Sequence, residues 1–220
     1  MARIAEDLFL LLLDNAAAQP ALDRKRRERV LAAAVLLDLA YACRIRPSLP
    51  GDAVEAGRLV ALAADGPTDP VVEPALQILQ KRALRPARAV SKISGDVQDN
   101  LALHLERLGQ IRRVRLPQKR SGQTYAWPMT HRDRAARART DLLSALFDRR
   151  PPTPTTAAIV TLLHAADGLG AVLSLNERGW RWVHARALEI ASGSWVDEYP
   201  TALPEINLAV TASALRSTLA

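Results

Sequence analysis

The longest apolar run of the chain, VLAAAVLLDLAYAC at Val30 to Cys43, constrains its fold more than any other feature. The run extends a segment that begins near Leu22, and its alanines and leucines lose little rotamer freedom in a helix. It contains Asp38 and is shorter than the roughly 20 residues that cross a bilayer. The sequence therefore predicts a long helix in a protein that does not span a membrane.

Apolar periodicity and turn signals predict further helices on both sides of this one. The clearest is at 96–108, where apolar residues recur at spacings of four, four and three. Gly109 follows in the position where glycine commonly ends a helix. Residues 54–63 fit a strand or a short helix equally well. The other predicted helices are at 5–14, 71–84, about 131–147, 156–173, 177–192 and about 205–219.

One segment, QIRRVRLPQKRSGQTYAWPM at 110–129, reads differently from the rest. Short alternating runs flank the turn QKRSGQ, which predicts a β-hairpin at about 111–128. Arginines lie before the turn, and Tyr125 and Trp127 lie after it. Strand alternation places these two aromatic residues on one face.

Composition narrows the class of protein. The chain has 220 residues, of which 49% are hydrophobic and 4% aromatic. These values favour a soluble, helix-dominated globular protein, and the length allows one large domain or two small ones. Cys43 is the single cysteine, which excludes an intramolecular disulfide and a multi-cysteine metal site and fits a cytoplasmic location.

No motif indicates catalysis. The four histidines have no helical metal-ligand spacing, and phosphate-loop, dinucleotide and nucleophile-elbow motifs are absent from the sequence. We therefore expect a protein that is not an enzyme and that has no cofactor, metal or catalytic residue.

Positive charge predicts an anionic partner. The net charge is +7, and residues 107–139 contain ten Lys or Arg residues against one acid, Asp133. A second cluster, at Arg24 to Arg29, forms the first turn of the long helix, where positive charge is unfavourable against the helix dipole. Such a chain tends to meet nucleic acid, anionic lipid or an acidic protein.

Two functions fit a helix followed by a basic hairpin. In a winged-helix nucleic-acid binder the helix would read bases and the hairpin would contact phosphates. Asp96 and Asp99 at the start of that helix would repel phosphates, which weighs against this alternative. In a membrane-surface module, arginines would attract anionic headgroups, and Tyr125 and Trp127 would enter the interfacial layer. A third possibility is that the aromatic residues pack inward and the arginines are only solvated.

Four stretches carry a resemblance to a known family. They are IAEDLFLLLLD at 4–14, LLDLAYACRI at 36–45, DNLALHLERLGQIRRV at 99–114 and LLHAADGLGAVL at 162–173. In order and spacing the chain resembles the Golgi phosphoprotein 3 family over most of residues 4–200, and the composition favours a bacterial member. The resemblance implies a single, mainly helical domain over residues 1–220: a central bundle ringed by amphipathic helices, with one protruding β-hairpin. It also implies binding of phosphatidylinositol 4-phosphate and an adaptor role for protein clients.

The headgroup positions of the family are not matched. Its tryptophan and arginine near the second helix fall on Asp23 and Ala32, and two further arginines fall on Gly95 and Gln98. We therefore expect the basic residues near these positions to bind anions by another geometry, in a protein that lies peripherally on the inner membrane surface. Beside the Asp23 position stand Arg24, Lys25, Arg26, Arg27 and Arg29. The predicted lipid- or anion-binding residues are Arg24, Lys25, Arg26, Arg29, Arg112, Arg113, Arg115, Lys119 and Arg120, and the predicted membrane contacts are Tyr125 and Trp127.

Overall fold

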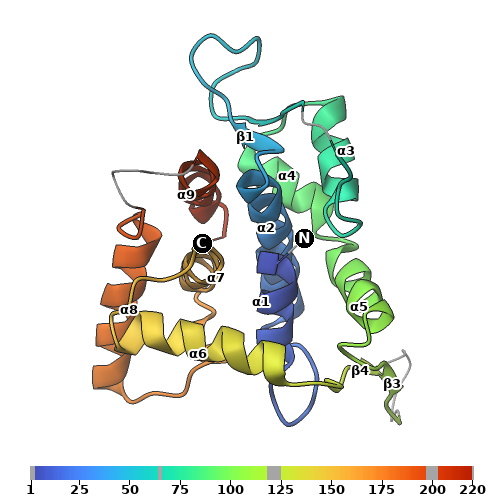
Figure 1. Ribbon diagram of the computed structural model, residues 1–220, viewed down its shortest axis with the longest axis vertical. Helices are drawn as coiled ribbons and strands as arrows, with labels where there is room; N and C mark the ends of the chain where they lie inside the picture. The colour runs from blue at the N-terminus through green and yellow to red at the C-terminus, as the bar shows by residue number, and fades with distance from the viewer. Residues whose placement is uncertain (1–2, 64–65, 118–124, 197–202, 220) are drawn as a thin grey trace.

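The computed structural model describes residues 3–63, 66–117, 125–196 and 203–219. Helices dominate this part of the chain, which confirms the predicted fold class (Figure 1). The helices are α1 (Arg3–Leu13), α2 (Arg24–Tyr41), α3 (Glu73–Lys81), α4 (Pro86–Ile93), α5 (Val97–Arg107), α6 (Asp133–Phe147), α7 (Pro154–Ala165), α8 (Glu177–Ala191) and α9 (Leu203–Arg216), with a 3-10 turn at Leu169–Ala171.

Three helices form the centre of the bundle. In α2 every residue from Val30 to Ala40 is buried, and α1 and α7 are buried on nearly all sides. A helix that is apolar all round has to be enclosed by other elements, and α2 packs against α1, α4, α5, α7 and α9. The apolar run that predicted the long helix is therefore the core of the molecule.

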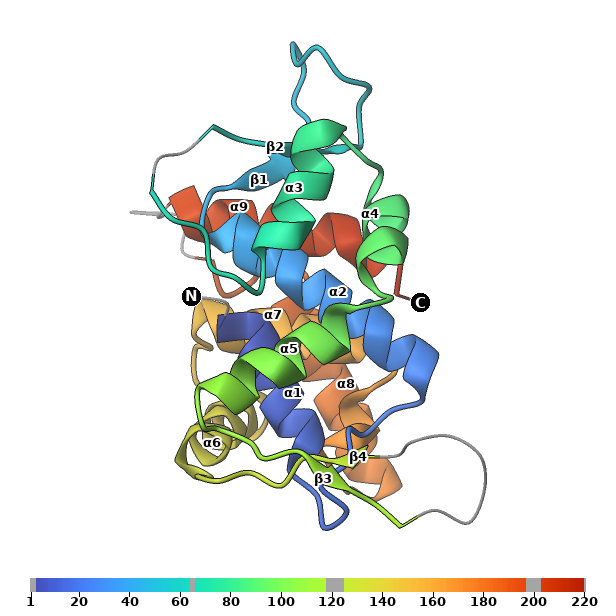
Figure 2. The ribbon, with the colours of Figure 1, turned by 90° about the vertical axis from the view of Figure 1, so that its right-hand side faces the viewer.

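The surrounding helices each bury one face. In α5 the buried residues include Val97, Leu101 and Leu105, as the spacing predicted. The sequence did not predict α4, because it is short and buries only Ala89 and Val90, too little apolar periodicity to detect. Together α3, α4 and α5 cover one side of the centre, and α6 and α8 lie on the other side (Figures 1 and 2).

The predicted hairpin is present at the end of the molecule where α5 finishes. Strand β3 (Val114–Arg115) pairs antiparallel with β4 (Tyr125–Ala126), and a bridge joins Ile111 to Met129. The predicted turn between the strands lies outside the described residues. Strands β1 (Ile45–Pro47) and β2 (Leu59–Ala61) form a second antiparallel pair. The segment at 54–63, which fits a strand or a short helix by sequence, therefore contains a strand.

Ionic contacts join the central and outer helices. Arg134 of α6 donates hydrogen bonds to Glu6 and, at 2.6 Å, to Asp7 of α1. Arg139 of α6 reaches Asp14 at 2.9 Å. Within the described ranges, no helix combines the length and the apolar character needed to cross a membrane.

Candidate functional site: a cavity between α2, α5 and the hairpin

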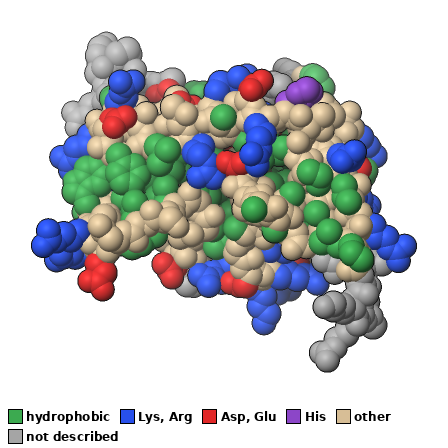
Figure 3. Space-filling view, turned by 90° about the horizontal axis from the view of Figure 1, so that it is seen from below, with side chains coloured by type: hydrophobic (Ala, Val, Ile, Leu, Met, Phe, Trp, Pro, Cys, Tyr) green, Lys and Arg blue, Asp and Glu red, His purple; other side chains and the backbone are tan. Residues whose placement is uncertain are grey.

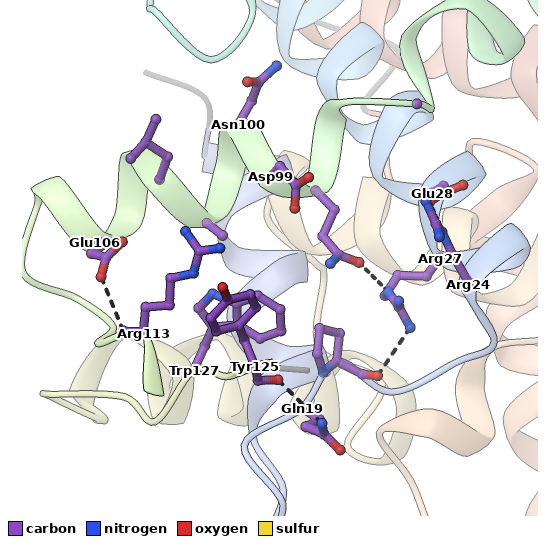
Figure 4. A pocket seen from close by; sticks show the side chains of 15 residues that line it. Gln19, Arg24, Arg27, Glu28, Asp99, Asn100, Glu106, Arg113, Tyr125 and Trp127 are labelled. Atoms are coloured by element: carbon purple, nitrogen blue, oxygen red, sulfur yellow. Dashed lines mark hydrogen bonds and ion pairs between the residues drawn. The ribbon is translucent and has the colours of Figure 1, made fainter. Parts of the chain in front are cut away.

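A cavity of about 800 Å³ lies between the start of α2, one face of α5 and the hairpin (Figure 4). Three segments far apart in sequence form it, together with the loop between α1 and α2. The residues that line it are Gln19, Pro20, Arg24, Arg27, Glu28, Gly95, Gln98, Asp99, Asn100, Ala102, Leu103, Glu106, Arg113, Tyr125 and Trp127.

The start of α2 is fixed by Asp23. Its side chain accepts a hydrogen bond of 3.1 Å from the backbone N–H of Arg26, which is an N-cap. Its second oxygen accepts from the Arg26 guanidinium at 2.6 Å, and the side-chain hydrogen bond from Arg26 lowers the pKa of Asp23. This carboxylate at the helix N-terminus accounts for the basic first turn, and Arg24 and Arg27, three residues apart, reach the cavity.

Arg27 is the cation most enclosed by the cavity wall. Its Nε donates to Oε1 of Gln98 at 2.5 Å, and its Nη1 donates to the backbone carbonyls of Pro20 and Leu22 at 3.3 and 2.8 Å (Figure 4). Burial lowers the pKa of Arg27 from its usual value. Among the described residues its hydrogen-bond partners are neutral, and the Glu28 and Asp23 carboxylates attract it without a hydrogen bond to it.

The charge of Arg24 is more exposed and already paired. Its Nε lies 2.6 Å from Oε1 of Glu28, and its side chain is 80% exposed. Ion pairs of this exposure contribute little free energy, so an anion can replace Glu28 at low cost. Asp99 on α5 also lines the cavity, so the wall is mixed in charge rather than uniformly basic.

The hairpin forms the third wall. The guanidinium of Arg113 lies 3.9 Å from the centre of the Tyr125 ring, a cation–π contact. The backbone N–H of Arg113 donates to Glu106 of α5 at 3.2 Å. The rings of Tyr125 and Trp127 are 6.3 Å apart, which confirms that they share a face.

The aromatic pair is only half-buried, and it is anchored. Trp127 packs against the core, and its backbone N–H donates to the carbonyl of Ala18 at 2.6 Å. Gln19 donates to the carbonyl of Tyr125 at 3.3 Å. The loop between α1 and α2 therefore fixes β4, and both rings face the cavity (Figure 4).

The structure separates the predicted anion-binding residues into groups. Arg24 and Arg113 line the cavity. Arg26 does not, because it turns to Asp23 and to the backbone carbonyl of Asp167, 3.3 Å away. The others that are described lie outside the lining: Lys25, Arg29, Arg112 and Arg115. Lys119 and Arg120 lie outside the described residues.

The four positions taken from the family resemblance have different environments. Gly95 and Gln98 line the cavity, whereas Ala32 is fully buried in the core and Asp23 caps α2. The cavity thus forms beside these positions. Its three arginines, Arg24, Arg27 and Arg113, come from α2 and the hairpin, and the lining also holds three carboxylates, those of Glu28, Asp99 and Glu106.

Sequence reasoning missed the importance of Arg27. It belongs to the basic cluster at 24–29 but is not among the predicted site residues. The available signal was its spacing of three from Arg24, which places both side chains on one helix face. The contact with Gln98, 71 residues away, was not visible in the sequence.

Outside the cavity, one group of side chains brings together atoms that could coordinate a metal ion. Oxygen or nitrogen atoms of Glu6, Asp69 and His104 lie within 4.8 Å of one another among the described residues. The Glu6 carboxylate, however, already contacts Arg134 and lies 3.4 Å from Nε2 of His104. The Arg134 guanidinium competes with a metal ion for this carboxylate, so the cluster is first of all an ion-pair network.

Comparisons with known proteins place the chain in a family. No curated protein matches it in a direct sequence comparison. The family model of Golgi phosphoprotein 3 (GPP34) matches residues 4–202, which is most of the chain and includes every wall of the cavity. The chain therefore belongs to the Golgi phosphoprotein 3 (GPP34) family.

Proposed function

We propose that the protein binds anionic lipid headgroups at a membrane surface, with the headgroup in the cavity between α2, α5 and the hairpin. The observation that carries the proposal is Arg27, a half-buried guanidinium whose described partners are neutral. Nε and Nη1 of Arg27 already donate to these partners, so Nη2 is the nitrogen that would donate to a phosphate oxygen, and a partly enclosed charge loses less attraction to solvent screening. Arg24 and Arg113 add charge at the cavity mouth.

The size and walls of the cavity suit such a ligand. Small-molecule sites commonly have volumes of roughly 300–1,000 Å³, and this cavity has about 800 Å³. Tyr125 and Trp127 add aromatic surface of the kind that favours the membrane interface. Seen from below, the molecule shows its largest hydrophobic area on the left, on the side of α8, and smaller hydrophobic areas with Lys and Arg near them on the right, the side of the hairpin (Figure 3).

The family resemblance suggests which lipid headgroup the protein binds and where in the cell it is located. A phosphatidylinositol 4-phosphate-like headgroup is the ligand that the resemblance implies, and a peripheral protein on the cytoplasmic membrane surface is the corresponding location. An adaptor role for protein clients would use the remaining surface. Nothing in the family or the described structure supports the winged-helix alternative.

Vesicle co-sedimentation tests the proposal. We expect the chain to sediment with vesicles containing phosphatidylglycerol or phosphatidylinositol 4-phosphate and not with neutral phosphatidylcholine vesicles. Arg24→Gln and Arg27→Gln should each weaken binding roughly fivefold, since a cation near an anionic surface contributes about 1 kcal/mol. Arg26→Gln is the matched control, because it removes the same charge from the same turn but outside the cavity.

Two results would contradict the proposal. One is an equal loss for Arg26→Gln and Arg27→Gln with unchanged thermal stability, which would show that only total charge matters. The other is a gel shift with random duplex DNA but no binding to any vesicle.

A variant with Trp180, Trp182 and Trp195 changed to Phe adds a fluorescence readout of Trp127. We expect its emission to shift to the blue when the protein binds vesicles, if the hairpin enters the membrane interface.

A further inference from the structure

A second concave site, of about 530 Å³, lies between Arg58, which directly precedes strand β2, and helices α3 and α4 with the segment that joins them. Eight residues line it, six of them cationic and the other two Ile78 and Leu84. No carboxylate is part of this lining in the described ranges. The six cations are Arg58, Lys81, Arg82, Arg85, Arg88 and Lys92.

The fold gathers these cations from three segments. Leu59 and Leu84 form a two-way backbone bridge, with N–H to carbonyl distances of 2.7 and 3.2 Å. That bridge brings Arg58 beside Arg85, which lies 27 residues further along the chain. Arg85 is the N-cap of α4, and Arg88 and Lys92 follow it at spacings of three and four, so the three side chains lie along one side of the helix, away from the buried Val90.

Two of the guanidinium groups are held in place by one carboxylate. Glu55 accepts from Arg58 at 2.6 Å and from Arg85 at 2.5 Å, using its two oxygens. Arg58 also donates to the carbonyl of Ala83 at 3.2 Å. Both guanidinium groups are therefore oriented before any ligand arrives, and only one negative charge offsets them.

The remaining four cations make no ion pair and no side-chain hydrogen bond within the described part of the chain. The α3 dipole accounts for Lys81, since a cation in the last turn of a helix is favourable. The α4 dipole favours Lys92 in the same way, but Arg88 and Lys92 are like charges four residues apart, which destabilises a helix. Like charges gathered in one site repel one another, and a polyanion bound there would offset that repulsion.

We propose that this site binds an anion that carries two or more clustered phosphate groups. Guanidinium groups suit phosphate because their planar array of donors matches its oxygens. Ile78 and Leu84 provide an apolar floor against which such a ligand excludes water from the contacts. A free polyphosphorylated molecule and a polyphosphorylated lipid headgroup share this chemistry.

The site is separate from the cavity between α2, α5 and the hairpin, and the inference stands without the function proposed for that cavity. The two sites have no lining residue in common. Helices α3 and α4 of this site and α5 of the cavity lie on the same side of the molecule (Figure 2).

Calorimetric titration of the full chain with inorganic tripolyphosphate tests the proposal. We expect binding that weakens with added salt and that falls at least about tenfold in the double variant Arg85→Gln, Arg88→Gln. The double variant Arg178→Gln, Arg181→Gln is the matched control, because it removes two exposed charges from α8 on the other side. A third variant, Arg24→Gln with Arg113→Gln, changes the other cavity, and a loss of tripolyphosphate binding there but not in the Arg85, Arg88 variant would overturn the proposal.

The source of the ligand is identified by vesicles that contain a phosphoinositide with several phosphates. Loss of vesicle binding in the Arg85, Arg88 variant supports a lipid headgroup, and loss of tripolyphosphate binding alone supports a free anion. The proposal is overturned if wild-type protein does not bind tripolyphosphate. It is also overturned if the α8 control loses as much affinity, or if the residues bind duplex DNA and not tripolyphosphate.

Discussion

At the scale of single residues, Asp38 shows how one buried polar group joins two helices. Its carboxyl oxygens accept hydrogen bonds from the backbone N–H groups of Ile4 and Ala5, each at 2.9 Å. These N–H groups belong to the first turn of α1, where no carbonyl of that helix can reach them. Burial raises the pKa of Asp38 to about 8, against the opposing effect of the two hydrogen bonds.

The raised pKa predicts how stability changes with pH. Asp38 ionises near its usual value of 3.8 in the unfolded chain and near 8 in the folded protein. Between these values the folded state binds the extra proton, so its stability falls as the pH rises. We expect the free energy of unfolding of wild-type protein, relative to Asp38→Asn, to decrease by at least about 1 kcal/mol from about pH 5 to about pH 8.

Urea denaturation of both proteins at a series of pH values measures this difference. Subtracting the variant removes the contributions of the other titrating groups, including Asp52, whose pKa is lowered to about 2 by Arg46. A difference that stays constant over this range would show that Asp38 remains ionised in the fold.

At the scale of elements, the end of α5 decides where the hairpin begins. Gly109 has φ +66°, and its N–H donates to the carbonyl of Glu106 at 3.0 Å. The N–H of Gln110 donates to the carbonyl of Leu105 at 2.9 Å. This pair of bonds is the Schellman motif, which turns the chain from α5 toward Ile111. The predicted role of Gly109 is confirmed.

Gly109→Ala should lower the free energy of unfolding by about 1 kcal/mol, because a side chain at positive φ is strained. A Cβ at this position meets no atom within 4 Å, so backbone strain is the sole expected cause. Gly95→Ala is the control, since its Cβ also has open space and its φ is not in the strained region. Equal stability of the two variants in chemical denaturation would contradict this account.

At the scale of the whole molecule, tertiary ion pairs reduce the basic surface that the sequence suggests. Residues 107–139 appear as an excess of nine positive charges when counted alone, ten cations less one acid. Arg132, Arg134 and Arg139 are nevertheless paired with acidic residues of α1 and of the turn after it. Their charges hold α6 against the centre of the bundle and do not form a free anion-binding face.

If the chain is a single domain, it should unfold as one cooperative unit. One cluster of buried residues includes members of all the described helices from α1 to α9. We therefore expect helix loss by far-UV circular dichroism and exposure of Trp127 by fluorescence to have the same denaturant midpoint. The fluorescence is measured with Trp180, Trp182 and Trp195 changed to Phe. Earlier exposure of Trp127 would indicate that the hairpin side unfolds as a separate unit.

Local pattern was enough to predict most helices, the hairpin, Gly109 and the family. These features depend on neighbours three or four residues apart, on strand alternation and on turn chemistry, which the sequence displays directly. The helix α4 was missed because its two buried residues give no periodic signal, and the pairing of β1 with β2 could not be read from residues 54–63 alone.

The sequence by itself therefore determined a helical bundle with an apolar centre, a basic hairpin and an excess of positive charge. Only the tertiary structure decided which charges remain available. Arg26 and Arg27 are neighbours of the same type, yet one turns to Asp23 and the other to Gln98 on α5. The difference arises because packing of α5 against α2 joins residues 71 positions apart, and a contact of that range has no counterpart in local sequence.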